Sequence, residues 1–79
     1  MNSEIATFET SDLYLIAYLK TQGFKYLVNK NKNKFIFTFN RCENFDNSLN
    51  LYLTETASVD PLMYSNTIKN IKNFIHNNI

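Results

Sequence analysis

A chain of 79 residues with a net charge of +1, 44% hydrophobic residues and one cysteine has the size and composition of a single small globular domain. One cysteine excludes an internal disulfide, and with one histidine it leaves too few ligands for a cysteine–histidine metal centre. The longest uninterrupted apolar run, residues 13–19, is far shorter than the ~20 residues that a membrane-spanning helix needs. We therefore expect one soluble, cytoplasmic domain over residues 1–79, with no metal, cofactor or membrane contact.

A short strand and a helix are the first predicted elements. Residues 4–10 contain side chains with β propensity, so we expect an extended segment there. Thr10 or Ser11 can cap the helix that follows, and Asp12 places a carboxylate in its first turn. Gly23 suits the left-handed position just after the helix end. The helix interior is apolar nearly all round, which predicts burial on more than one side.

Two runs of alternating residues predict a β-hairpin. The runs, residues 24–29 and 34–40, flank a polar tip over residues 30–33, where asparagine tolerates the positive φ that such tips need. Within each run, every second side chain points to the same face. We expect the face with the larger rings to be buried, because the stripe of the last helix needs an apolar floor. The side chains assigned to this buried face are Phe24, Tyr26, Val28, Phe35, Phe37 and Phe39.

Two further helices are predicted in the second half of the chain. The first covers residues 43–53, and the second begins with Asp60 as its cap and Pro61 in the first helical position. Their apolar residues recur at helical spacing: Phe45, Leu49, Tyr52 and Leu53 in one, and Tyr64, Ile68, Ile71 and Ile75, widened by Phe74, in the other. The order strand, helix, hairpin, helix, helix predicts a small two-layer α+β domain, with the helices packed on one face of an antiparallel sheet.

The succession of these motifs resembles a family of small domains of unknown function that occurs in phages, other mobile elements and low-GC bacteria. The resemblance rests on F-E-T-S-D-L-Y-L-I-A-Y-L-K-T-Q-G-F, then K-F-I-F-T-F, then V-D-P and finally I-K-N-F-I, and it covers nearly the whole chain. At Ile16-Ala17 the family more often has two small residues. The resemblance implies the fold described above and a phage or mobile-element setting, but it implies no activity and no catalytic residues.

Side chains suited to catalysis are few. His76 is the only histidine, and a pairing with Cys42 would lack a third group to orient it. Asp12 and Asp60 both lie at predicted helix starts, where capping or a first-turn carboxylate explains them. A chain with one glycine has no Gly-rich phosphate loop. We therefore expect no enzymatic activity, no catalytic residue and no small-molecule substrate.

Positive charge gathers in the predicted hairpin. Its cations have no acidic residue between them and are suited to contact phosphates, while the Phe-rich strand is suited to stack on bases. The core, however, needs those rings, so a solvated tip beside a core strand is the simpler interpretation. A weak nucleic-acid-binding protein is therefore the alternative hypothesis, and the residues that would carry it are Lys25, Lys30, Lys32, Lys34 and Arg41.

More apolar surface is predicted than one small core can bury. The first helix carries Tyr14 and Tyr18, and Leu27 and Ile36 point to the outer face of the hairpin. Contiguous apolar surface usually marks a contact, and tyrosine suits interfaces; the N-terminal segment is the alternative cover. Our main hypothesis is a non-enzymatic interaction module, an accessory protein of a phage or mobile element that binds another protein or forms a homodimer through these four residues.

Overall fold

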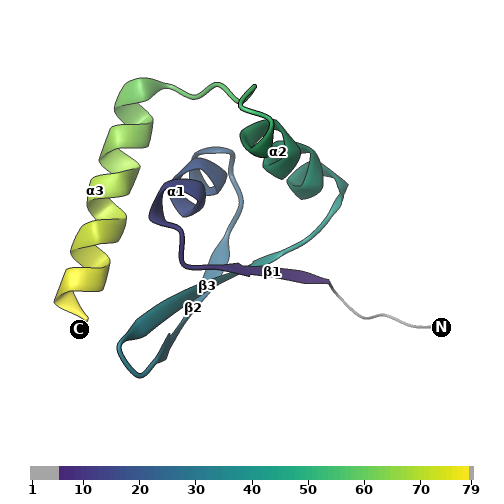
Figure 1. Ribbon diagram of the computed structural model, residues 1–79. Helices are drawn as coiled ribbons and strands as arrows, with labels where there is room; N and C mark the ends of the chain where they lie inside the picture. Colours follow the sequence, from purple (N-terminus) through teal and green to yellow (C-terminus); the bar gives the residue numbers. More distant parts are fainter. Residues whose placement is uncertain (1–5, 79) are drawn as a thin grey trace.

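The computed structural model describes residues 6–78 and contains a three-stranded antiparallel sheet with three helices on one face (Figure 1). The central strand is β3, so the strand order is β1-β3-β2. This confirms the predicted small α+β fold; of the predicted first strand, residues 4 and 5 lie outside the described residues. The elements are β1 (Thr7–Thr10), α1 (Leu13–Thr21), β2 (Tyr26–Asn31), β3 (Lys34–Asn40), α2 (Glu43–Leu53) and α3 (Pro61–Asn77).

The cap of α1 differs from the prediction. Asp12 is the N-cap, and its Oδ1 accepts a hydrogen bond from the backbone N–H of Tyr14 at 3.1 Å. Thr10 is still in β1, where its hydroxyl oxygen accepts from the backbone N–H of Asp12. The Ser11 hydroxyl donates to the backbone oxygen of Phe35 at 2.7 Å and so joins the start of α1 to the sheet. Neither hydroxyl is therefore available to cap the helix.

The end of α1 follows the prediction. Gly23 has a φ of 96°, a conformation that side-chain-bearing residues rarely adopt. Its backbone N–H donates to the carbonyl of Lys20, and the N–H of Phe24 donates to the carbonyl of Leu19. These two bonds form the Schellman motif, which satisfies carbonyls that the helix end leaves without partners. The chain then turns directly into β2.

Helix α1 forms the centre of the domain. It lies above the sheet, with α2 on one side and α3 packed along the other (Figure 1). Five consecutive residues, 15–19, are between 0% and 6% exposed, so the prediction of burial on more than one side is confirmed. A helix that is apolar all round requires such surroundings, because each of its sides must be removed from water.

The three phenylalanine rings of β3 belong to the core, as predicted. Phe35, Phe37 and Phe39 are 8%, 1% and 0% exposed. Their cover differs from the expectation, because α3 packs mainly against α1 and reaches these rings through Phe74, whose ring centroid lies 6.1 Å from that of Phe35. Phe45 of α2 packs on Phe39, with ring centroids 5.5 Å apart, so α2 provides part of the cover.

The hairpin tip is shorter than predicted. Asn31 pairs with Lys34, which leaves Lys32 and Asn33 as a two-residue turn instead of a tip over residues 30–33. Lys32, not an asparagine, has the positive φ, at 61°. The strands extend further because cross-strand pairing continues through their polar ends, where side-chain hydrophobicity gives no signal.

Candidate functional site

The residues considered for catalysis remain separate. Cys42 is exposed before α2 and His76 is exposed in the last turn of α3, and these two helices lie on opposite sides of α1 (Figure 1). Asp60 accepts a hydrogen bond from the backbone N–H of Leu62 at 3.0 Å, so it caps α3 as predicted. Within residues 6–78, no three His, Cys, Asp or Glu side chains are close enough to hold a metal ion. No helix in that part of the chain has the length and apolar character needed to cross a membrane.

Tyr18, one of the four predicted interface residues, lies in the core of the domain. Its side chain is 2% exposed, and its hydroxyl donates to the backbone oxygen of Ser48 at 3.0 Å. Its ring centroid lies 5.2 Å from that of Tyr52 in α2. The position of α2 against α1 covers this tyrosine and provides an acceptor for its hydroxyl.

Tyr14 is 52% exposed, but it belongs to a junction of helices. Its backbone oxygen accepts a hydrogen bond from the hydroxyl of Tyr64 at 3.0 Å, which ties α3 to the first turn of α1. Burial raises the pKa of Tyr64, and the nearby Tyr52, Asp12 and Tyr14 raise it further. Burial, followed by the charge of Asp12, also raises the pKa of Tyr52. Tyr14, Tyr52 and Tyr64 come from α1, α2 and α3, and they lie near one another where these helices meet.

Among residues 6–78, no helix lies over one face of the sheet (Figure 1), and we call it the open face. The strand register assigns its side chains, because they alternate with those that pack against the helices. Leu27 is 74% exposed on this face, and Ile36 is its diagonal neighbour. The side chains of the open face are Thr7, Glu9, Leu27, Asn29, Asn31, Lys34, Ile36, Thr38 and Asn40.

The open face does not include all four predicted interface residues. Leu27 and Ile36 lie on it, whereas Tyr14 is on the helical side of the sheet and Tyr18 is buried. These residues therefore form no single surface. The sequence alone could not exclude a single surface formed by these four residues, because it does not determine which side of α1 faces the sheet.

Two shallow depressions lie on the open face, to either side of its central strand. The larger, about 260 Å³, lies beside β1, and the smaller, about 190 Å³, beside β2. Thr38 lines the smaller depression, and its Oγ1 is buried and makes no hydrogen bond with the described residues. The larger is lined by Glu9, Thr10, Ser11, Lys34 and Ile36, and the smaller by Lys25, Tyr26, Leu27, Thr38 and Asn40.

A second group of exposed apolar side chains lies where α2 ends and α3 begins. Leu53, Leu62 and Met63 are 65%, 69% and 50% exposed, and Leu53 helps to line a depression of about 490 Å³. The helical spacing that predicted α2 included Leu53, whose side chain the fold leaves exposed. At 100° per residue, Leu53 is about 80° from the buried Phe45 around the helix. This angular offset was the feature of the sequence that indicated a position at the margin of the buried face.

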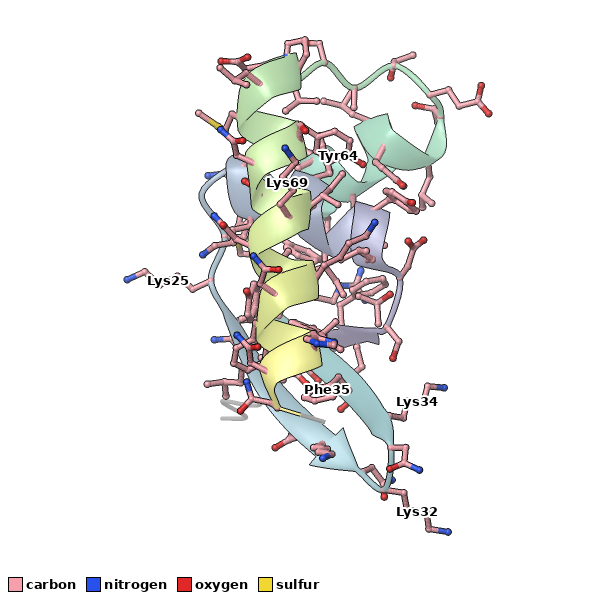
Figure 2. All side chains as sticks on the ribbon, turned by 90° about the vertical axis from the view of Figure 1, so that its left-hand side faces the viewer. Lys25, Lys32, Lys34, Phe35, Tyr64 and Lys69 are labelled. Carbon is pink, nitrogen blue, oxygen red and sulfur yellow. The ribbon has the colours of Figure 1, made fainter. Side chains whose placement is uncertain are left out.

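The predicted basic residues are dispersed by the fold. Arg41 pairs with Asp46 of α2 at 3.0 Å, and this hydrogen bond raises the pKa of the Arg41 guanidinium. Lys25 points away from α3, whereas Lys32 and Lys34 project near the hairpin tip (Figure 2). The Lys30 Nζ donates to the backbone oxygen of Asn78 at 3.0 Å. Three of the five cations thus lie near the tip, and two lie elsewhere.

The fold and these surfaces define a small α+β domain with an open, three-stranded sheet. A family profile described as "Domain of unknown function (DUF5659)" matches residues 5–77, so the chain belongs to this family. The prediction of a small domain of unknown function is thereby confirmed. A search of curated proteins and a search of solved structures each gave no match.

Proposed function

We propose that this domain is a non-enzymatic interaction module that binds protein through the open face of its sheet, a second copy of the chain being the simplest partner. The observation that carries the proposal is the 74% exposure of Leu27 on a sheet face that no helix or strand of residues 6–78 covers. A large apolar side chain in water loses the stabilisation of about 1.5–3 kcal/mol that full burial would provide. A partner that covers Leu27 and Ile36 would recover part of it.

The surroundings of Leu27 support a protein partner. β1 and β2 are edge strands, so each has backbone N–H and C=O groups that the sheet does not use. Extended chains bind such edges by adding a strand, and two sheets pack face to face about 10 Å apart. The polar side chains around Leu27 and Ile36 would form the rim of the interface.

The exposed leucines at the ends of α2 and α3 are the competing surface. Leu53 and Leu62 are nearly as exposed as Leu27. They project from the ends of two different helices, where no strand edge lies beside them. The open face combines apolar side chains with unpaired backbone groups, and for this reason we prefer it.

Self-association tests this proposal directly. Sedimentation equilibrium at micromolar concentrations is expected to detect dimers of the wild type, and Leu27→Lys to abolish them, because a charge in a desolvated interface is costly. Leu53→Lys is the matched control, since it places the same charge at a comparably exposed leucine. A monomeric wild type would exclude a second copy as the partner. Equal loss with both variants would exclude the open face.

We further propose that the protein is an accessory protein of a phage or mobile element and acts in the cytoplasm of the host cell. The motif order described above, from T-S-D-L-Y-L-I-A-Y-L to V-D-P, supports this setting through its resemblance to domains of such elements. The genes that flank this one provide the test. Phage structural or host-takeover genes are the expected neighbours, and an ordinary chromosomal metabolic operon would contradict the proposal.

A further inference from the structure

Charge is strongly segregated along this chain. Every Lys and Arg except Lys20 lies in residues 24–42 or residues 61–77, and neither segment contains Asp or Glu. In the fold these segments are the β2–β3 hairpin with its flanks and helix α3. A protein with a net charge of +1 therefore has one strongly cationic part and one acidic part. Where the fold gathers such charges on one surface, that surface is the electrostatic footprint of a polyanion-binding protein.

The fold brings the two cationic segments together. The last turns of α3 contact the hairpin through the rings of Phe74 and Phe35, whose centroids are 6.1 Å apart. Lys30 Nζ donates to the backbone oxygen of Asn78 and lies 5.7 Å from the centroid of Phe35. Figure 2 shows the outer side of α3 facing the viewer, with Lys69 on it and the hairpin tip below. The outer side of α3 and the tip thus form one continuous part of the molecule.

Five lysines define what we call the basic surface. Lys69 and Lys72 are three residues apart on α3 and are exposed, as are the asparagines between and beside them. Lysine and asparagine side chains are common donors to phosphate oxygens. The lysines of the basic surface are Lys30, Lys32, Lys34, Lys69 and Lys72.

The charges of the basic surface are available to a ligand. Within residues 6–78 the single ion pair joins Arg41 and Asp46, so none of these five lysines is neutralised by a neighbouring carboxylate. Glu9 lines a depression together with Lys34, so we expect Lys34 to attract an anionic ligand less strongly than the other four lysines do. Lys30 covers a backbone carbonyl at the C-terminal end of α3, where the helix dipole would otherwise repel an anion.

We propose that the basic surface binds nucleic acid through its phosphate backbone, without reading base sequence. The five lysines supply the charge, and release of condensed counterions from the nucleic acid supplies the driving force. The rings of β3 take no part in this site, because they are buried beneath the helices. The site differs from a basic hairpin alone: α3 contributes Lys69 and Lys72, whereas Arg41 is engaged with Asp46.

Fluorescence anisotropy with labelled single-stranded and duplex DNA of random sequence tests the site. The wild type is expected to bind at about 50 mM salt and to lose on the order of 100-fold in affinity at about 200 mM, as four or so phosphate contacts require. Lys32→Gln/Lys34→Gln and Lys69→Gln/Lys72→Gln are each expected to weaken binding roughly tenfold at the lower salt concentration. The two probes decide whether a flexible strand or a duplex fits the surface better.

Lys20→Gln/Lys25→Gln is the matched control. It removes the same net charge outside the basic surface, and an affinity within about threefold of the wild type is expected if local contacts matter more than net charge. Circular dichroism verifies that all variants fold. Absence of binding to both probes at low salt overturns the inference, as does equal weakening by all three double variants. Binding to vesicles of anionic lipid but to neither probe would also overturn it. Lys34 belongs to both surfaces, but Lys69 and Lys72 lie on α3, on the helical side of the sheet, so Lys69→Gln/Lys72→Gln and Leu27→Lys test this inference and the proposed dimer separately.

Discussion

The two faces of the sheet are built from the same three strands but differ in almost every physical respect. On the helical face, Phe37 and Phe39 are at most 1% exposed; on the open face, Leu27 is 74% exposed. Residues next to each other in a strand can lie in these two different environments, because successive side chains point to opposite faces of the sheet. The difference teaches that the stability of this domain rests on one face, which leaves the residues of the other available for binding.

The sharpest test of this contrast is truncation of one residue on each face. Phe39→Ala is expected to reduce the free energy of unfolding by about 3–5 kcal/mol, because it removes a fully buried ring that packs against Tyr26 and Phe45. At a protein concentration where the domain is monomeric, Leu27→Ala is expected to change it by less than about 0.5 kcal/mol. Urea denaturation followed by circular dichroism measures both variants at that concentration. Comparable losses would mean that Leu27 is buried within its own chain.

Thr38 is the exception on the open face, because its hydroxyl oxygen is buried without a partner among the described residues. Thr38→Val replaces the hydroxyl with a methyl group of similar size and is expected to raise the free energy of unfolding by about 1 kcal/mol. Thr7→Val is the control, since Thr7 is exposed on the same face, and a change within about 0.5 kcal/mol is expected there. A loss of stability in Thr38→Val would show that the hydroxyl has a partner in solution.

The helical side of the domain is expected to become less stable at high pH. In the folded protein, burial raises the pKa of Tyr64, with further contributions from Tyr52, Asp12 and Tyr14. The folded state therefore holds the phenolic proton more tightly than the unfolded state. Its contribution to stability is complete below the ordinary pKa of about 10 and is lost as the pH rises through the raised value.

Tyr64→Phe is expected to show a smaller loss of stability above about pH 10 than the wild type. Tyr26 and Tyr52, whose pKa values burial also raises, retain part of the alkaline effect. At neutral pH the variant lacks the hydrogen bond to the backbone oxygen of Tyr14 and is expected to lose up to about 1 kcal/mol. Denaturation at several pH values measures both effects, and identical alkaline slopes would contradict the role assigned to Tyr64.

Sequence alone predicted the elements well because their signals are local. Alternation assigned Phe35, Phe37 and Phe39 to the buried face, and helical spacing predicted a helix over residues 43–53, the range that α2 occupies. Pro61 and its preceding aspartate predicted the start of α3. Each of these features depends on neighbours within a few positions, which a periodicity or a cap can reveal.

The candidate surfaces were less predictable because they depend on packing between distant elements. Tyr14 and Tyr18 both lie on a helix that is apolar all round, and only the placement of α2 decides that Tyr18 is covered. Arg41 was grouped with the hairpin lysines, but the fold supplies Asp46 as its partner. Lys69 was not among the predicted basic residues, because nothing local indicates that the end of α3 lies against the hairpin.

The strand order β1-β3-β2 has a consequence for synthesis on the ribosome. β1 and α1 emerge early, yet β1 pairs with β3, and α1 is covered by α3 at the far end of the chain. One side of the apolar helix at the centre of the domain therefore stays uncovered until α3 has left the exit tunnel. A nascent chain of this protein should depend on chaperones until its last helix docks, and truncation before α3 should yield an insoluble product.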